Sequence, residues 1–392
     1  MNRVQGLSVI WWNSWVCAMH DLTLQRVFHV HLKDYTRDHK LDSQRLKVCR
    51  HLMDCHTPAL GGIAYRCDRC DSEVPLYHSC RDRHCPQCQQ RASRQWCEQQ
   101  QQAILPVTYH HLVFTLPHEL NGWVQLHPEV IYGVLFRSVW KTLKAFGADP
   151  KRLNGKLGMT AVLHTWGQTL AQHVHLHCLV PGGALSDNNQ WHAAKSNYLF
   201  PVKALSRHYR GNLVSALRRC VKKGKLSRVT RPDEVDTLLN QLMQKDWVVY
   251  SKHCMNRTDS IIGYLARYTH RIAISNRRIL SIDKDQVRFR YKDYHDDQSK
   301  IMALDYREFI RRFLRHVLPK GFMRLRHYGI LANRCRQKSV KLIRKILTVP
   351  VVENTGTTDN ETVIYPCPKC RQGQLIVKHR ITPVPLVHPL PS

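Results

Sequence analysis

Residues 172–180 read Gln-His-Val-His-Leu-His-Cys-Leu-Val, and this alternation predicts how the middle of the chain folds. Alternate side chains of a β-strand share a face, so His173, His175 and His177 should lie together. The opposite, core-facing side carries Val174, Leu176 and Cys178. Two imidazoles about 6.5–7 Å apart along one face can bind the same metal ion. We therefore predict a metal site here; the alternative is a solvated sheet face.

A third metal ligand is expected on a neighbouring strand. His164 lies eleven residues before His175 and qualifies if the two strands pair. His173 is the alternative third ligand, and Gln168 is a weaker one. The sequence leaves this choice open.

Strand-like and helical segments alternate irregularly around these histidines. Residues 109–117 (Tyr-His-His-Leu-Val-Phe-Thr-Leu-Pro) and 157–165 are rich in β-branched and aromatic residues and predict strands. Residues 128–146 repeat apolar side chains every three or four positions and predict a helix. There is no repeat of fixed period and no Gly-rich phosphate loop. An α+β domain with a central antiparallel sheet is the expected fold.

A second informative segment covers residues 261–271, Ile-Ile-Gly-Tyr-Leu-Ala-Arg-Tyr-Thr-His-Arg. On a helix, Tyr264 and Tyr268 share a face one turn apart, and Arg267 and Arg271 repeat the same spacing. A buried aromatic pair is the usual meaning of this pattern. Beside a histidine metal site, the alternative is that tyrosine attacks a phosphodiester held by the arginines.

The cysteines are spaced in pairs, which is typical of thiolate metal sites rather than disulfides. Cys67-Asp-Arg-Cys70 and Cys85-Pro-Gln-Cys88 are separated by 14 residues. Together they predict one closed, structural four-cysteine zinc site. A second site is a further hypothesis, and its candidate ligands are Cys55, Cys80 and His84, with His51 nearby. The alternative is that these are buried or surface residues without a metal.

One more pair, Cys367-Pro-Lys-Cys370, follows a polar stretch at residues 353–360 that indicates a linker. No second pair follows it. A metal site here would need Cys335, a histidine such as His379, or another chain.

The charge balance indicates a polyanionic partner. The chain has 392 residues, 60 Lys and Arg against 29 Asp and Glu, and a formal net charge of +31. Residues 207–228 and 311–345 contain no acid and hold most of this excess, which favours nucleic acid. We expect both basic runs to flank the site formed by the histidines and tyrosines. The longest apolar stretch, residues 7–19, is shorter than the roughly 18–20 residues that a bilayer needs. A weak signal peptide is the alternative for that stretch, but the cysteine pattern favours a reducing compartment.

These motifs together resemble a known superfamily. His175-Leu-His177 resembles the His-hydrophobic-His motif of the HUH endonucleases, and Tyr264-x-x-x-Tyr268 resembles the paired nucleophiles of its two-tyrosine transposases. The sequences of residues 81–88 and 313–333 resemble segments of the zinc-binding insertion-sequence transposases of bacteria. The resemblance covers roughly residues 45–340.

The resemblance implies an HUH-type central antiparallel sheet with flanking helices, preceded by a zinc-ribbon domain and followed by basic helices. It implies a cytoplasmic bacterial enzyme that cleaves and rejoins single-stranded DNA through 5′-phosphotyrosine intermediates. It further implies Mg2+ or Mn2+ at the histidines, structural zinc and help from a host helicase. The arginines expected to contact DNA are Arg267, Arg271, Arg277 and Arg278.

The expected domains are residues 1–102 with zinc, 105–300 with the catalytic site, 301–348 as a basic helical extension, and 349–392 as a linker and tail. Two other functions fit these motifs. A rolling-circle replication initiator or relaxase would use the same chemistry. A non-catalytic zinc-ribbon regulator would use the histidines and tyrosines only structurally.

Overall fold

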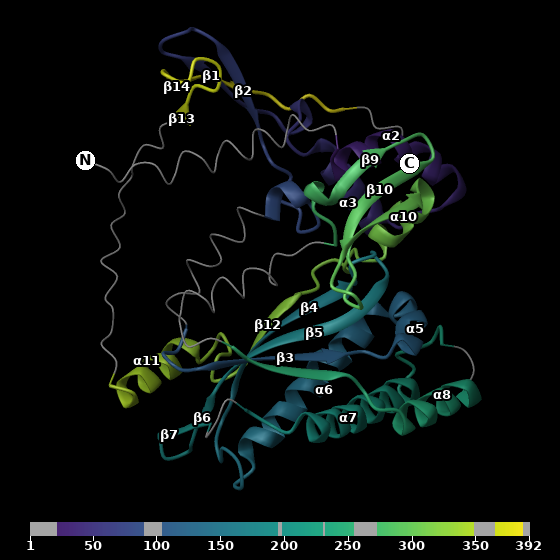
Figure 1. Cartoon of the computed structure of the whole chain (residues 1–392), viewed down its shortest axis with the longest axis vertical. Helices are drawn as coiled ribbons and strands as arrows, with labels where there is room; N and C mark the ends of the chain where they lie inside the picture. The colour runs from purple at the N-terminus through teal and green to yellow at the C-terminus, as the bar shows by residue number, and fades with distance from the viewer. Residues whose placement is uncertain are drawn as a thin grey trace.

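The computed structural model describes residues 22–89, 104–194, 198–229, 232–254, 273–348 and 365–386 (Figure 1). Within these ranges, none of the helices combines the length and the apolar character that crossing a membrane requires.

A five-stranded antiparallel sheet forms the centre of the molecule, in the order β12-β4-β5-β3-β8. Its strands are β3 (Tyr109–Thr115), β4 (Gly158–Trp166), β5 (Gln172–Pro181), β8 (Val249–Cys254) and β12 (Leu325–Gly329). The predicted strands at residues 109–117, 157–165 and 172–180 are therefore confirmed. The α+β class with a central antiparallel sheet is confirmed as well.

Helices cover one face of this sheet (Figure 1). They are α5 (Asn121–Leu126), α6 (Pro128–Ala148), α7 (Val202–Lys222) and α8 (Pro232–Gln244). Helix α6 begins with a proline, which fits the first turn because it lacks an N–H there. Its buried apolar side chains pack on the core-facing side chains of β3, β4 and β5, so the sheet has one dry face.

The alternation in β5 places the histidines on the other face. Val174, Leu176 and Cys178 are fully buried under the helices. His175 and His177 point away from that core and are half-buried. The predicted division of the strand into a core face and a histidine face is confirmed.

A second core joins the N-terminal helices to a smaller sheet. Helices α2 (Leu24–Asp38) and α3 (Ser43–Asp54) pack with α10 (Tyr306–Leu314) and with strands β9 (Ile279–Ile282), β10 (Gln286–Lys292) and β11 (Ser299–Asp305). The three strands form an antiparallel sheet in the order β11-β10-β9. Helix α2 begins after Thr23, whose hydroxyl accepts the Arg26 N–H as an N-cap.

A separate small sheet, the ribbon, is formed by strands from the N-terminal and C-terminal parts of the chain. Strands β1 (Gly62–Cys67) and β2 (Glu73–Tyr77) form a hairpin, and β14 (Gln374–Ile381) pairs with the free edge of β1. The short β13 (Tyr365–Pro366) completes the order β13-β14-β1-β2. Figure 1 shows the yellow C-terminal strands beside this N-terminal hairpin. The small hairpin β6 (Gly183–Leu185) and β7 (Trp191–Ala193) and helix α11 (Arg336–Ile346) lie at the far end of the molecule.

Two predicted domain boundaries are wrong. The boundary at residue 300 falls inside β11, and the predicted basic helical extension contributes β12 to the central sheet. The predicted tail contains β13 and β14, which belong to the ribbon. Strand β12 pairs with β4 and strand β14 pairs with β1, and both partners are distant in sequence. The local composition of a segment does not indicate such a distant partner.

The basic residues are divided differently from the prediction. Helix α7 carries most of the run at residues 207–228, yet its apolar side packs on the core face of the sheet, opposite the histidines. In the second run, Arg311 and Arg312 pair with Glu308, which precedes the run. Arg326 lies over the Phe136 ring, 4.3 Å from its centre. The prediction that both runs flank the site is therefore wrong for α7, and Arg311, Arg312 and Arg326 of the second run are among those that contact the protein itself.

Candidate metal centres

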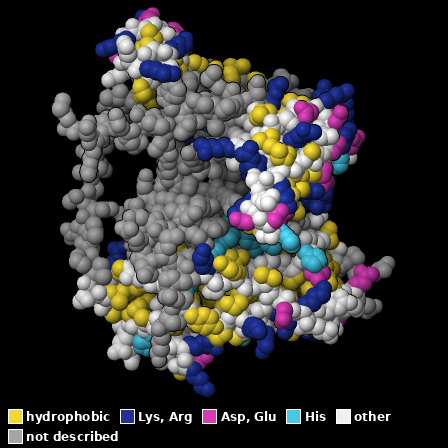
Figure 2. Space-filling view, viewed as in Figure 1, with side chains coloured by type: hydrophobic (Ala, Val, Ile, Leu, Met, Phe, Trp, Pro, Cys, Tyr) yellow, Lys and Arg dark blue, Asp and Glu magenta, His cyan; other side chains and the backbone are white. Residues whose placement is uncertain are grey.

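Strand pairing brings three histidines together on the face away from the helices. The register of β4 and β5 places His164 directly opposite His175. His177 lies two residues further along β5 on the same face and is therefore a diagonal neighbour of His164. One ring nitrogen from each of the three lies within 4.8 Å of the others. Figure 2 shows histidine side chains gathered where Figure 1 labels β4 and β5.

The hydrogen bonds around these rings indicate which nitrogens face a metal. The Nδ1 of His175 lies 2.9 Å from the carbonyl oxygen of His173, which can only accept, so Nδ1 donates. In neutral imidazole the proton on Nδ1 leaves Nε2 as a lone pair. This Nε2 lies 3.0 Å from the Nε2 of His177. Two ligands about 2.1 Å from one ion and at right angles would be about 3.0 Å apart, so the spacing fits an octahedral divalent cation.

His111 is a functional candidate that the sequence interpretation missed. It lies on β3, and its Nε2 is 2.8 Å from the Nδ1 of His177, with the two rings stacked. Burial lowers the pKa of His111 to about 4, with Lys252 contributing, so its ring is neutral at neutral pH. A neutral His111 can accept the Nδ1–H of His177 and leave Nε2 of His177 for a metal. Such outer partners fix the tautomer of a metal ligand.

We expect His111→Phe to weaken metal binding without removing the ligands. Phenylalanine keeps an aromatic ring against His177 but cannot hydrogen-bond to its Nδ1. Loss of such a partner usually lowers metal affinity roughly 10–100-fold. Direct titration of the protein with Mn2+ should show a rise of that size in the dissociation constant. His173→Ala, on the exposed start of β5, is the control. Equal dissociation constants for Mn2+ in His111→Phe and wild type would contradict this role.

The alternatives for the third ligand are placed less favourably. The side chain of His173 is exposed, and its ring lies against that of His175 with ring centres 4.8 Å apart. Its ring nitrogens are not among those that converge with His164, His175 and His177, whereas its carbonyl group accepts from Nδ1 of His175. The side-chain amide of Gln168 donates to the hydroxyl of Tyr294 at 3.0 Å. His164 is 2% exposed and is the histidine that the register places beside the pair.

Trp166 links the histidine group to a small cavity between the central sheet and the second core. Trp166 stacks on His164, with ring centres 4.8 Å apart. Trp166 also lines the cavity, together with Ala273 and Arg324. Burial, and then Arg83, lower the pKa of Arg324 to about 10, still well above neutral. The cavity therefore has a cationic group beside the Trp166 ring.

The predicted nucleophiles and two of the predicted DNA contacts lie outside the described residues. These are Tyr264, Tyr268, Arg267 and Arg271. Ala273, the first described residue after this segment, lines the same cavity as Trp166. Arg277 is exposed and remains a candidate DNA contact. Arg278 donates to the carbonyl groups of Arg290, Ala273 and Gln168, so the geometry assigns it to holding this loop rather than to contacting phosphate.

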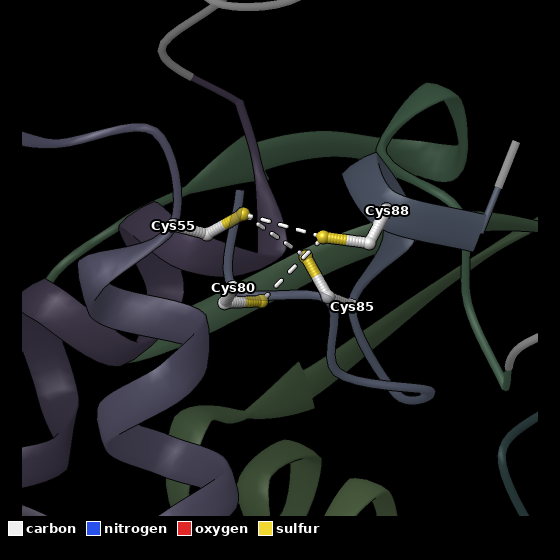
Figure 3. Close-up of side chains that lie close together, drawn as sticks. All are labelled: Cys55, Cys80, Cys85 and Cys88. Atoms are coloured by element: carbon white, nitrogen blue, oxygen red, sulfur yellow. Dashed lines mark hydrogen bonds between the residues drawn. The ribbon is translucent and has the colours of Figure 1, made fainter. Parts of the chain in front are cut away.

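Four cysteines meet at the edge of the second core (Figure 3). They are Cys55, Cys80, Cys85 and Cys88. The Sγ atoms of Cys55 and Cys88 are 3.6 Å apart, and those of Cys80 and Cys88 are 3.5 Å apart. These spacings are far longer than the roughly 2.05 Å of a disulfide. They approach the roughly 3.8 Å edge of a tetrahedron of thiolates about 2.3 Å from zinc.

His84 belongs to a different network. Its Nδ1 and its backbone N–H both lie 2.8 Å from Oδ1 of Asp82, and His51 contacts the other carboxylate oxygen. Burial alone would raise the pKa of Asp82, but these hydrogen bonds hold it at about 2. The Nε2 of His84 accepts the Leu318 N–H at 3.3 Å. Both ring nitrogens of His84 are thus engaged away from the cysteines, and the prediction that it completes a zinc site is wrong.

The predicted pairing of the cysteine knuckles is also wrong. Cys85 and Cys88 gather with Cys55 and Cys80, which precede them in the chain, whereas Cys67 and Cys70 lie in the ribbon. The second group of four is Cys67, Cys70, Cys367 and Cys370. The knuckle spacing predicted metal ligands but carried no information on which pairs share an ion.

Comparison with known proteins finds similarity to transposases in the N-terminal part and in the central part of the chain. A family model described as "Putative transposase" matches residues 158–339, and one described as "Transposase zinc-binding domain" matches residues 27–116. The chain is 39% identical to "Putative transposase y4qJ" of Sinorhizobium fredii, over 89% of this chain and 93% of that protein. It is 28% identical to "Transposase for insertion sequence element IS801" of Pseudomonas savastanoi pv. phaseolicola, over 72% and 69% of the two chains. No solved structure matches it.

Proposed function

The chain belongs to the zinc-binding transposases of bacterial insertion sequences, and we propose that it cleaves and rejoins single-stranded DNA through 5′-phosphotyrosine intermediates. The observation that carries this proposal is the histidine group on the face of the central sheet away from the helices. Three converging imidazoles on one sheet face are difficult to explain by packing, because a core would place apolar side chains there.

The histidines are proposed to hold a divalent cation. His175 and His177 present Nε2 atoms 3.0 Å apart, and His164 approaches from the neighbouring strand. Imidazole ligands favour Mn2+ over Mg2+. The ion would polarise the scissile phosphate. The chain's contribution is to fix the donor atoms: the His173 carbonyl orients one ring and His111 orients the other.

Tyr264 and Tyr268 are the proposed nucleophiles. A tyrosine oxygen attacks phosphorus, a new bond forms between them, and the bond to the 3′ oxygen breaks and releases a 3′-OH. The ester keeps the energy of the broken phosphodiester, so the reverse attack by a 3′-OH rejoins DNA without ATP. Ala273, the first described residue after the tyrosine segment, lines the same cavity as Trp166, which stacks on His164; this position of Ala273 supports the assignment.

The structural zinc is proposed to be bound by Cys55, Cys80, Cys85 and Cys88. Cys55, Cys85 and Cys88 are buried in the core that contains α2, α3 and α10. A zinc ion there would tie the loop carrying Cys80 to these helices. From that loop, Arg83 donates to the carbonyl groups of Pro319 and Phe322 and so connects the zinc-binding domain to the catalytic part.

DNA at the ends of the element and at its target is the proposed partner. The net charge of +31 favours a polyanion, and the exposed Arg277 lies on the loop that follows the tyrosine segment. Helix α11 adds the exposed Lys338, Lys341 and Lys345. No helicase motif is evident in the sequence, so unwinding is assigned to a host helicase.

A covalent-adduct assay tests the proposed function. Full-length protein is incubated with single-stranded oligonucleotides from the element ends and Mn2+, then separated under denaturing conditions. We expect a DNA–protein adduct and a free 3′-OH product, both lost when EDTA removes the metal. A duplex of the same sequence should give much less adduct and much less 3′-OH product. Binding without an adduct on any end sequence would overturn the proposal in favour of a non-catalytic DNA-binding regulator.

A further inference from the structure

The four cysteines of the ribbon come from opposite ends of the chain. Cys67 and Cys70 end β1 and open its turn, whereas Cys367 and Cys370 lie between β13 and β14. The Sγ atoms of Cys67 and Cys370 are 3.7 Å apart, and so are those of Cys70 and Cys367. All four lie within 4.8 Å of one another. We infer that they bind a second structural zinc ion, which fastens the C-terminal segment to the N-terminal ribbon.

The sulfur spacing supports a tetrahedral thiolate site. A disulfide would bring two sulfurs to about 2.05 Å, and none of these pairs approaches that distance. Four thiolates about 2.3 Å from zinc are separated by about 3.8 Å, close to the observed 3.7 Å. Both knuckles also have the two-residue spacing that turns a pair of sulfurs toward one ion.

Backbone N–H groups surround the sulfurs as they do in metal knuckles. The N–H groups of Arg69 and Cys70 donate to the Sγ of Cys67 at 3.4 and 3.5 Å. The N–H of Gly373 donates to the Sγ of Cys370 at 3.3 Å. Such bonds stabilise negative charge on sulfur, which is the form that binds zinc.

Two backbone features allow the two knuckles to lie close together. A Cβ added at Gly373 would lie 2.4 Å from the Sγ of Cys67, so only glycine permits this contact. Asp71 and Arg371 each follow the second cysteine of a knuckle, and both have left-handed backbones with φ of 57° and 60°. The two knuckles therefore make the same kind of turn around the proposed ion.

The ribbon depends on the C-terminal segment. Strand β14 pairs with β1 along its whole length, from Gly62 opposite Ile381 to Cys67 opposite Leu375. Tyr65 packs edge-on against Tyr365, and Lys378 pairs with Glu73 of β2. Without β14, the long edge of β1 would be exposed, which is unfavourable for a strand. Zinc would hold together two segments separated by about 300 residues and would offset the entropy of closing that loop.

Zinc content tests the inference. The measurement uses full-length protein carrying His175→Ala and His177→Ala, so that the proposed catalytic site cannot retain zinc. After dialysis against a weak chelator, we expect two zinc ions per chain by elemental analysis. Adding Cys367→Ser and Cys370→Ser should leave one. Cys335→Ser, which changes a cysteine outside both groups, should leave two and serves as the matched control.

The alternative pairing gives a different result. If Cys67 and Cys70 shared one zinc with Cys85 and Cys88, the Cys367→Ser/Cys370→Ser change would not alter the zinc content. That result, or a single zinc in the starting protein, would overturn the inference. Substitution with Co2+ gives an independent measurement, since the thiolate-to-cobalt absorption should fall by half in the serine variant. The zinc count does not depend on nuclease activity, so failure here leaves the proposed function untouched.

Discussion

Replacing His175 and His177 together by alanine should abolish DNA cleavage while leaving most DNA binding intact. Both rings lie on the sheet face away from the core, so their removal takes away metal ligands rather than core packing. A metal that stabilises the transition state contributes several kcal/mol, so we expect a loss of at least roughly 10³-fold in the cleavage rate. The measurement is single-turnover cleavage of an end oligonucleotide with saturating Mn2+.

Three comparisons make this prediction specific. Binding of the same oligonucleotide should keep its salt dependence, because that comes from phosphate contacts rather than from the histidines. His164→Ala should approach the double variant in cleavage, whereas His173→Ala should stay within a few-fold of wild type. Near-normal cleavage by His175→Ala/His177→Ala would contradict the metal site. A larger loss for His173→Ala than for His164→Ala would reverse the choice of third ligand.

Replacing Tyr264 and Tyr268 together by phenylalanine should eliminate the covalent DNA adduct. Phenylalanine preserves the ring but lacks the oxygen that forms the phosphotyrosine bond, so no adduct can form by this route. Each single variant should still form an adduct through its remaining tyrosine, but its strand rejoining should be impaired. The measurement is the fraction of labelled oligonucleotide that remains bound to protein after denaturation.

A tyrosine elsewhere in the chain provides the matched control. Tyr250 on β8 is exposed, and its replacement by phenylalanine should leave the adduct yield unchanged. Metal binding should also survive in Tyr264→Phe/Tyr268→Phe, because the histidines are intact. An adduct of normal yield in the double variant would show that another residue is the nucleophile.

The local parts of this fold could be predicted from the sequence. The alternation in residues 172–180 predicted both the strand and its two faces, because side-chain direction in a strand depends only on position. The apolar spacing of residues 128–146 predicted α6 in the same way. His164 became a candidate because the preceding strand is close in sequence, and the structure shows that this strand, β4, pairs with β5.

What the sequence could not supply was the choice of distant partners. His111 contacts His177 only through the register of β3 and β5, 66 residues apart. Each cysteine knuckle is compatible with any other, and pairing of β1 with β14 decides which two meet in the ribbon. The apolar stripe of α7 could not indicate which face of the sheet it covers, and so its basic residues were predicted on the wrong side.

Identification of the residue that carries DNA tests the central claim most directly. Wild-type protein is trapped on an end oligonucleotide in Mn2+, digested with nuclease and protease, and analysed by mass spectrometry. The account predicts a nucleotide phosphate on the phenolic oxygen of Tyr264 or Tyr268, and none in protein pre-treated with EDTA. A phosphate on serine, on histidine or on a tyrosine outside this pair would contradict it.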